Sequence, residues 1–188
     1  MNANEMIARA EFLSQHYEDG KFQERSPREG AYRACLVEDG YAFKAVHNVR
    51  DVNANRAEWD FYAMTTDEIR AKLAKPVYIS RNGLVIVMVA ITPWRERKNG
   101  FEGNLSHWEN ELDELTKSTY GFNIGDTHGG NWGVDSEGNV LMLDYGSMEW
   151  HAKRWEHEKI PYEKRHETPE PGYHKEIMAE MLLTKSNN

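Results

Sequence analysis

Residues 125–146 read Gly-Asp-Thr-His-Gly-Gly-Asn-Trp-Gly-Val-Asp-Ser-Glu-Gly-Asn-Val-Leu-Met-Leu-Asp-Tyr-Gly. Glycines in this segment let the backbone bend tightly and approach a ligand closely. The polar side chains that stand between the glycines and can carry chemistry are those of Asp126, His128, Asn131 and Asp144. Each residue taken alone is typical of a surface turn, because Asp, Asn and Gly are the usual turn residues. The spacing of the whole set favours a functional site.

Two of these residues carry the hard oxygen atoms that Mg²⁺ prefers, namely Asn131 and Asp144. Thirteen positions separate them, with strand-like residues at 132–135 and 139–143. A hairpin of this length returns the chain to its start, so we expect both oxygens to converge on one ion. Asp126 offers a second carboxylate, which can act as a base or position a nucleophile.

The amino-terminal half predicts two further hairpins. The first joins residues 31–38 to 41–48 through Asp39-Gly40, a strong two-residue turn signal. The second joins residues 77–80 to 84–91, and its second run is continuously apolar, as in a buried central strand. Before residue 120, helical periodicity is expected in four segments, at residues 3–18, 53–64, 66–74 and 107–119.

Composition excludes several classes of function. The 188-residue chain has a formal net charge of −8, which argues against direct nucleic-acid binding, because phosphates are held by concentrated Lys and Arg. The single cysteine permits no internal disulfide, which fits a cytoplasmic protein. We expect neither a signal peptide nor a membrane span, because the longest apolar run, 84–91, is far too short.

The order Asp126, Asn131 and Asp144-Tyr145-Gly146 resembles the catalytic and metal-binding loops of the protein-kinase-like superfamily. The separations of five and thirteen residues are those of ordinary protein kinases. Gly125 to Asn131 is closer to the aminoglycoside- and choline-phosphotransferase branch, and also resembles compact serine/threonine kinase-like proteins of tailed bacteriophages. The resemblance implies ATP and Mg²⁺ as cofactors.

The resemblance also implies a role for each matched residue. Asp126 would orient or deprotonate the attacking hydroxyl, and His128 would lie near the γ-phosphate. Asn131 and Asp144 would hold Mg²⁺ and, through it, the nucleotide. Kinase catalysis consists mainly of positioning and charge neutralisation, so these few groups would form its core.

Four upstream residues extend the resemblance to the nucleotide site. Lys44 would be the phosphate-binding lysine of the third strand, provided that residues 21–26 or a divided 31–38 segment supply the other two. Glu58, on the helix that follows, would pair with Lys44, although an exposed helical carboxylate is the common alternative. Adenine would meet the backbone near Met88, and Gly30 would belong to the glycine-rich loop.

The sequence departs from the superfamily pattern in three places. Residues 30–34 contain one glycine where kinases have two or three, and Ile124 stands where they have His. Only 42 residues follow Gly146, and no Ala-Pro-Glu motif is among them. We therefore expect an α+β, minimal protein-kinase-like fold with an antiparallel-sheet N-lobe and a strongly reduced C-lobe.

This expected fold divides the chain into two parts. Residues 1–150 would form the kinase-like domain, with the N-lobe at about 21–92 and the catalytic and metal loops at 120–148. Residues 151–188 would form a charged arm followed by a short helix at 174–184.

Three functions compete on these features. The first is an ATP- and Mg²⁺-dependent phosphotransferase, a small phage-type protein kinase that acts on a host protein. The second is a catalytically weak or inactive kinase-like binding module that inhibits or recruits a host protein. The third is a metallophosphoesterase, because Gly-Asp-Thr-His-Gly resembles the first metal motif of that class. Such enzymes also need Gly-Asp and Gly-Asn-His segments downstream, and neither follows residue 131.

Overall fold

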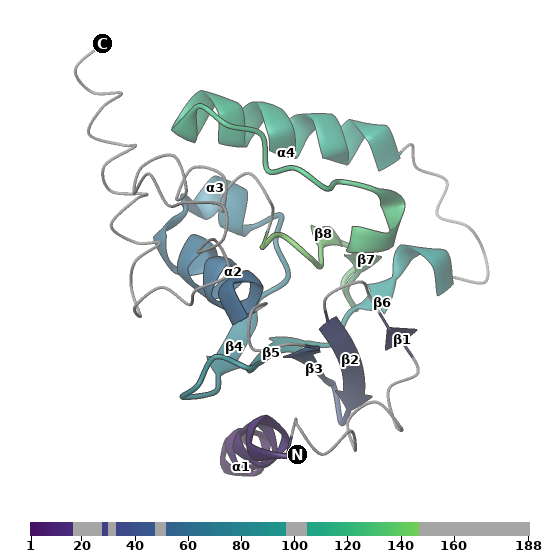
Figure 1. The fold of residues 1–188 in the computed structure, drawn as a ribbon. Coiled ribbons are helices and arrows are strands. Elements are labelled where there is room, and N and C mark those ends of the chain that lie inside the picture. The colour runs from purple at the N-terminus through teal and green to yellow at the C-terminus, as the bar shows by residue number, and fades with distance from the viewer. Residues whose placement is uncertain (17–27, 30–32, 48–51, 97–104, 147–188) are drawn as a thin grey trace, which may run out of the picture.

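The computed structural model describes residues 1–16, 28–29, 33–47, 52–96 and 105–146. The described chain is an α+β structure in which helices surround an antiparallel sheet of five strands (Figure 1). Gly30 and the arm and helix expected within 151–188 lie outside the described residues.

The five-stranded sheet places the third strand at its centre. Its spatial order is β1 (Arg28–Glu29), β2 (Arg33–Glu38), β3 (Tyr41–Val46), β5 (Val85–Val89) and β4 (Pro76–Ile79). All neighbouring strands are antiparallel. Lys44 lies on β3, the third of the described strands, and β1 at 28–29 is the first of them, whereas residues 21–26 lie outside the described residues.

The predicted turn at Asp39-Gly40 is confirmed and sets the register of the β2–β3 hairpin. Both residues have positive φ, at 47° and 82°, as a type I′ turn requires. Glu38 therefore lies opposite Tyr41, and Arg33 lies opposite Val46. Because side chains alternate along a strand, this register fixes which residues of β2 share a face with Lys44.

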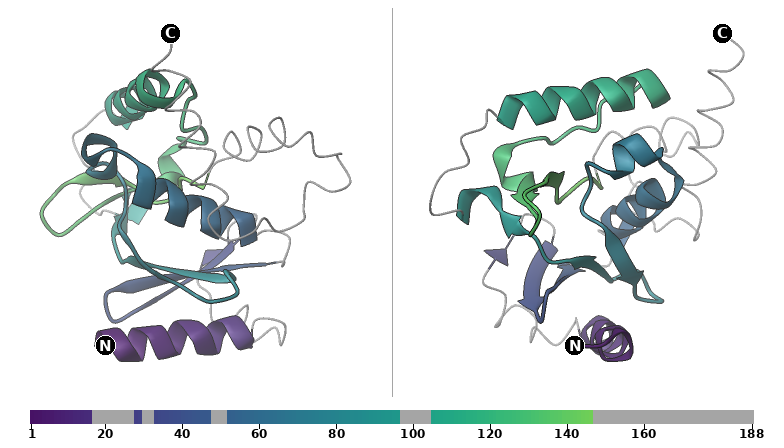
Figure 2. Two further views of the ribbon diagram at one scale, coloured as in Figure 1. Left: turned by 90° about the vertical axis from the view of Figure 1, so that its left-hand side faces the viewer. Right: turned by 180° about the vertical axis from the view of Figure 1, so that it is seen from behind.

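Helices cover both faces of the sheet, as Figures 1 and 2 show. Helix α1 (Ala3–Gln15) lies on one face, and α2 (Val52–Met64) lies on the other. The core beneath α1 consists of Met6, Ala10, Leu13, Ala34, Phe43, Ala45, Val85 and Val87. Residues 85–88 are at most 2% exposed, which confirms that the apolar run forms a buried central strand.

The elements after β5 lie on the same side of the five-stranded sheet as α2, partly beside α2 and partly above it (Figure 1). They include a three-stranded sheet of β6 (Thr92–Pro93), β7 (Trp132–Val134) and β8 (Val140–Met142). The helical segments near it are α3 (Asp67–Arg70), η4 (Trp94–Glu96), α4 (Leu105–Tyr120) and η5 (Gly129–Asn131). The largest core cluster joins them through Phe61, Ile69, Leu112, Ile124, Trp132, Met142 and Tyr145.

Helix α3 ends earlier than its periodicity predicts. The expected helix runs to about residue 74, whereas α3 ends at Arg70. Leu73 instead forms a parallel bridge with Met142, and the Ala74 amide donates to the Met142 carbonyl at 2.9 Å. Contact with the distant β8 therefore outweighs the local helical preference. None of the described helices is long and apolar enough to cross a membrane.

Candidate functional site

Glu58 is the centre of the candidate site. Its side chain is completely buried on α2, and its carboxylate accepts hydrogen bonds from three different segments of the chain. The donors are the guanidinium of Arg33, the ammonium of Lys44 and the backbone amide of Tyr145. A buried carboxylate is stable only when it is paired in this way. The alternative of an exposed helical glutamate is therefore wrong.

Lys44 links the five-stranded sheet to the segment after β8, residues 143–146. Its Nζ lies 3.2 and 3.3 Å from the two carboxylate oxygens of Glu58. The same ammonium donates to the carbonyl oxygen of Leu143, the residue before Asp144. The predicted pairing of Lys44 with Glu58 is thus present, and it lies next to the predicted metal-binding segment.

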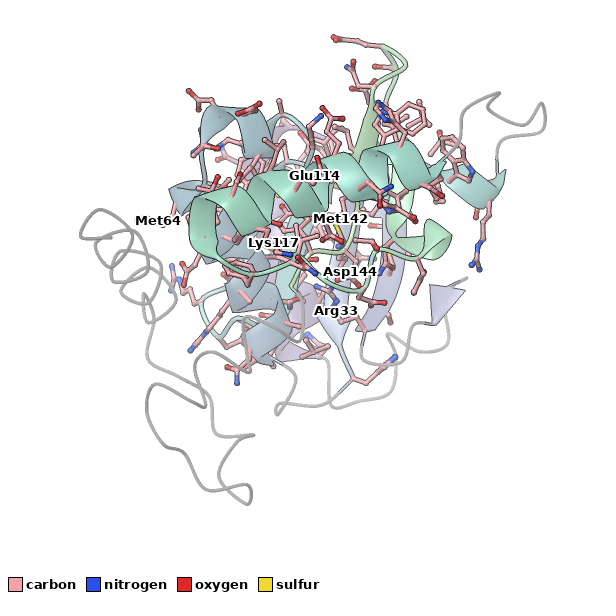
Figure 3. All side chains as sticks on the ribbon, turned by 90° about the horizontal axis from the view of Figure 1, so that it is seen from above. Arg33, Met64, Glu114, Lys117, Met142 and Asp144 are labelled. Atoms are coloured by element: carbon pink, nitrogen blue, oxygen red, sulfur yellow. The ribbon has the colours of Figure 1, made fainter. Side chains whose placement is uncertain are left out.

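Arg33 occupies a position that the sequence analysis did not assign to the site. Nη1 and Nη2 donate to the two oxygens of Glu58 at 2.9 and 3.0 Å, which forms a bidentate pair. Nη2 also forms an ion pair with Asp144 Oδ1, and Figure 3 shows these two side chains next to each other. The side chain of Arg33 is 8% exposed, whereas that of Asp144 is 42% exposed.

Neighbouring charges shift the pKa values of both Asp144 and Arg33. Burial alone would raise the pKa of Asp144, but Arg33 and Lys44 outweigh it and hold that pKa well below its usual range. Burial would lower the pKa of Arg33, but Asp144 and Glu58 raise it above its usual value. Both groups are therefore charged at neutral pH, and the cluster holds two cations against two carboxylates.

Close contact with α2 explains why Tyr145 and Gly146 follow Asp144. The Tyr145 ring is buried, its hydroxyl donates to the Ala74 carbonyl at 2.7 Å, and its amide donates to Glu58 at 3.1 Å. Burial, together with the charge of Glu58, raises the pKa of Tyr145 well above its usual value. A Cβ at Gly146 would lie 2.5 Å from the Ala54 carbonyl oxygen, so only glycine fits there.

Asn131 joins the two halves of the predicted motif. Its Nδ2 donates to the Asp126 carbonyl at 2.7 Å, and its own carbonyl accepts from the Leu143 amide at 2.6 Å. The second bond lies beside the first pair of the β7–β8 hairpin, Trp132 opposite Met142. The hairpin therefore returns the chain to its start and brings Asn131 next to the segment that leads into Asp144. The convergence of the Asn131 and Asp144 side-chain oxygens on one ion stays a prediction.

The loop before Asn131 presents two polar side chains to solvent. Asp126 and His128 are 58% and 59% exposed, with 3.6 Å between Asp126 Oδ1 and His128 Nε2. His128 Nδ1 accepts a hydrogen bond from the Gly130 amide at 3.0 Å, so in the neutral ring the proton is on Nε2, which faces Asp126. Asp126 has a φ of 46°, an uncommon conformation that Asp tolerates better than most residues.

The donor types of Asn131 and Asp144 are compatible with Mg²⁺. Asn131 offers an amide oxygen and Asp144 a carboxylate, and both are hard donors of the kind that Mg²⁺ prefers. One oxygen of Asp144 is engaged by Arg33, so a metal would compete for this carboxylate. Among the described residues, no group of three or more His, Cys, Asp or Glu side chains forms a ready metal site.

Met88, near which adenine was predicted to meet the backbone, lies apart from the cluster around Glu58. Its side chain is 2% exposed and belongs to the largest core cluster. The amides of Val89 and Ala90 already donate to the carbonyls of Lys75 and Gly40. The contact of adenine with this backbone stays a prediction.

Arg33 and Asn55 are the site residues that sequence reasoning missed. Asn55 Oδ1 accepts from Arg33 at 3.2 Å, and its Nδ2 donates to the Gly83 carbonyl at 3.0 Å. A signal for Arg33 was present, because the Asp39-Gly40 turn places it opposite Val46 and hence on the face of Lys44. Asn55 lies three residues before Glu58 on the same face of α2.

Comparisons of the chain with models of protein families, with curated proteins and with solved structures returned no match.

Proposed function

We propose that this protein is an ATP- and Mg²⁺-dependent phosphotransferase of the protein-kinase-like superfamily. The observation that carries the proposal is the contact of Lys44 with both Glu58 and the Leu143 carbonyl. A lysine of the third strand paired with a glutamate of the following helix is required in active protein kinases, together with a metal-binding Asp. Here Asp144 follows Leu143 directly, so these parts meet in one place.

The chain supplies the polar groups that phosphoryl transfer needs. Lys44, oriented by Glu58, would bind phosphate oxygens of the nucleotide. Asp126 would accept a hydrogen bond from the acceptor hydroxyl and receive its proton, because its carboxylate is exposed. His128 Nε2–H faces the same side as this carboxylate and would donate to a phosphate oxygen or to Asp126 itself.

Asn131 and Asp144 would hold Mg²⁺, which neutralises the charge of the β- and γ-phosphates when it is bound. Asn131 is suited to this role because its amide nitrogen is fixed by the Asp126 carbonyl. Its remaining side-chain oxygen is then the atom available to a cation. The same bond holds the backbone of Asp126 next to Asn131.

We further propose a protein as the phosphoryl acceptor, in keeping with the resemblance to small phage kinases that act on host proteins. The exposure of Asp126 and His128 supports a large acceptor, because neither side chain is enclosed.

A second candidate function is a kinase-like binding module with little or no catalysis. The specific observation in its favour is the ion pair between Arg33 and Asp144, since the guanidinium engages an oxygen that a metal would need. The two candidates differ in one measurable property, the transfer of phosphate.

The test of the main proposal has a binding arm and a transfer arm. Binding of a fluorescent ATP analogue with Mg²⁺ is measured by titration for wild type, Lys44→Met and Lys72→Met. Lys72 is the matched control, because it pairs with Glu111 at 2.8 Å on the surface, away from Glu58. We expect Lys44→Met to bind at least about tenfold more weakly, consistent with the loss of a charge-assisted phosphate contact, and Lys72→Met to bind as wild type does.

The transfer arm follows radiolabel from γ-labelled ATP into the protein itself and into casein. Asp126→Asn and Asp144→Asn should abolish the label, whereas Asp67→Asn, an exposed carboxylate paired with Arg70, should not. Nucleotide binding without transfer in wild type would support the binding module. Equal labelling in wild type and both site variants would refute the assignment of Asp126 and Asp144.

A further inference from the structure

The guanidinium of Arg33 is almost fully engaged by groups of the protein. Nη1 donates to Glu58 at 2.9 Å and to Asn55 at 3.2 Å. Nη2 donates to Glu58 at 3.0 Å and pairs with Asp144. Three of these four contacts go to α2, and only the contact with Asp144 goes to the segment after β8.

Asp144 therefore has a cation beside it before any metal arrives. An arginine side chain does not lose its charge in a protein, so Arg33 neutralises the Asp144 carboxylate for as long as the two side chains are paired. A divalent ion that coordinates Asp144 has to displace the guanidinium or share the carboxylate with it. Sharing brings two cations, the divalent ion and the guanidinium, together at one carboxylate, and their mutual repulsion is unfavourable.

We propose that Arg33 is the resident counter-ion of Asp144 and competes directly with the divalent metal for this carboxylate. The inference rests on the proposed function for the role of Asp144 as a metal ligand. Arg33 acts through Asp144, so it is a positioning residue: it keeps the metal ligand neutralised and in place in the metal-free protein. A bound divalent ion would supply this neutralisation in place of Arg33.

Replacement of Arg33 by a divalent ion at Asp144 would leave the other contacts of Arg33 in place. When Asp144 is released, Arg33 keeps its bidentate pair with Glu58 and its contact with Asn55. The guanidinium is then still paired, so its release leaves no isolated buried charge. The side chain of Asp144 is 42% exposed, so an ion can approach this carboxylate from solvent.

The experiment measures Mn²⁺ binding in the absence of nucleotide, by electron paramagnetic resonance of the free ion. Wild type is compared with Arg33→Gln, Arg9→Gln and the double variant Arg33→Gln/Asp144→Asn. We expect Arg33→Gln to bind Mn²⁺ at least about tenfold more tightly than wild type. A ligand-competent minor state populated at about 10% or less lowers apparent affinity by that factor, and the substitution makes this state dominant.

The Arg9→Gln variant controls for net charge. Arg9 forms a two-bond pair with Glu38, at 2.8 and 2.9 Å, on the α1 side of the sheet. The Arg9→Gln substitution removes one positive charge from the protein at a site that does not contact Asp144. The Mn²⁺ affinity of this variant should therefore equal that of wild type. The double variant Arg33→Gln/Asp144→Asn should not show the higher Mn²⁺ affinity of Arg33→Gln, because Asp144 is the ligand that the first substitution makes available.

A merely structural arginine would behave differently, since its loss would lower stability and leave Mn²⁺ affinity equal or weaker. That result in a folded Arg33→Gln protein would overturn the inference. If Arg33→Gln does not fold, Arg33→Lys replaces it, because a lysine cannot form the fork to both carboxylates. Tighter Mn²⁺ binding by Arg33→Lys supports the competition, and unchanged binding refutes it.

Wild type offers a second readout that needs no variant. With ¹⁵N-labelled arginine, the Arg33 Nη signals should shift on addition of saturating Mg²⁺, whereas those of Arg9 should not. Unchanged Arg33 signals at saturation would refute the exchange. The main proposal fails separately, through loss of nucleotide binding or of transfer, so the two failures are distinguishable.

Discussion

The amide of Tyr145 donates a hydrogen bond to Glu58 Oε1 at 3.1 Å, and this contact fixes the segment after β8 against α2. The same carboxylate accepts from Lys44 and Arg33. One buried glutamate therefore holds the sheet, helix α2 and the segment after β8 together.

Removal of this carboxylate should strongly destabilise the protein. We expect Glu58→Ala to lower the free energy of unfolding by about 3–5 kcal/mol, because two largely buried cations lose their shared partner. Glu111→Ala, which breaks the more exposed pair with Lys72, should cost less than about 1 kcal/mol. Urea denaturation followed by circular dichroism measures both values. Similar values for the two variants would show that Glu58 is not the organising group.

Substitution of Asp126 by Asn should separate catalysis from folding. Asn adopts the left-handed conformation about as readily as Asp, so the φ of 46° is retained and stability should change little. The loss of the proton acceptor should lower phosphate transfer by about 10²–10⁴-fold. Label transfer and the urea midpoint are measured on the same preparation. A variant that unfolds earlier and still transfers phosphate at the wild-type rate would contradict both expectations.

Gly146 should not tolerate a side chain. In Gly146→Ala the new Cβ would lie 2.5 Å from the Ala54 carbonyl and 3.1 Å from Glu58 Cγ, so the helix or the segment has to move. We expect a loss of about 1–3 kcal/mol or more. Gly129→Ala is the matched control, because its Cβ would meet only the flexible end of Leu105, at 3.1 Å. Thermal denaturation should show the larger drop for Gly146→Ala, and the reverse order would count against the close approach.

The ion pair of Asp144 should make stability depend on pH in the acid range. Its pKa is lower in the folded protein than the unfolded value of about 3.9. The unfolded state then binds protons more readily, so the stabilisation is complete above about pH 5 and declines as the pH falls. Asp144→Asn should be less stable than wild type at pH 7, and the difference should shrink below about pH 5. Urea denaturation at pH 7, 5, 4 and 3 tests this, and a constant difference would exclude the pair as the cause.

Much of the fold was predictable because its signals are local. Asp39-Gly40 specified a hairpin and its register, and the continuous apolar run specified a strand that is buried on both faces. The length of helix α3 was not predictable, because contact of Leu73 with Met142 ends it.

The candidate site was predictable where spacing in the chain sets distance in space. The interval between Asn131 and Asp144 predicted a hairpin, and the Leu143–Asn131 hydrogen bond lies at the base of that hairpin. The pairing of Lys44 with Glu58 was instead implied by the resemblance to protein kinases, and the two side chains lie 3.2 Å apart.

The sequence by itself determined which elements form, because turns, alternation and helical periodicity act over a few residues. It also determined which polar groups stand at the ends of those elements. Only the tertiary structure decided that Arg33 shares Glu58 with Lys44 and neutralises Asp144. The physical reason is that a buried carboxylate takes whichever cations the packing of sheet against helix brings within reach, and that packing joins segments distant in the chain.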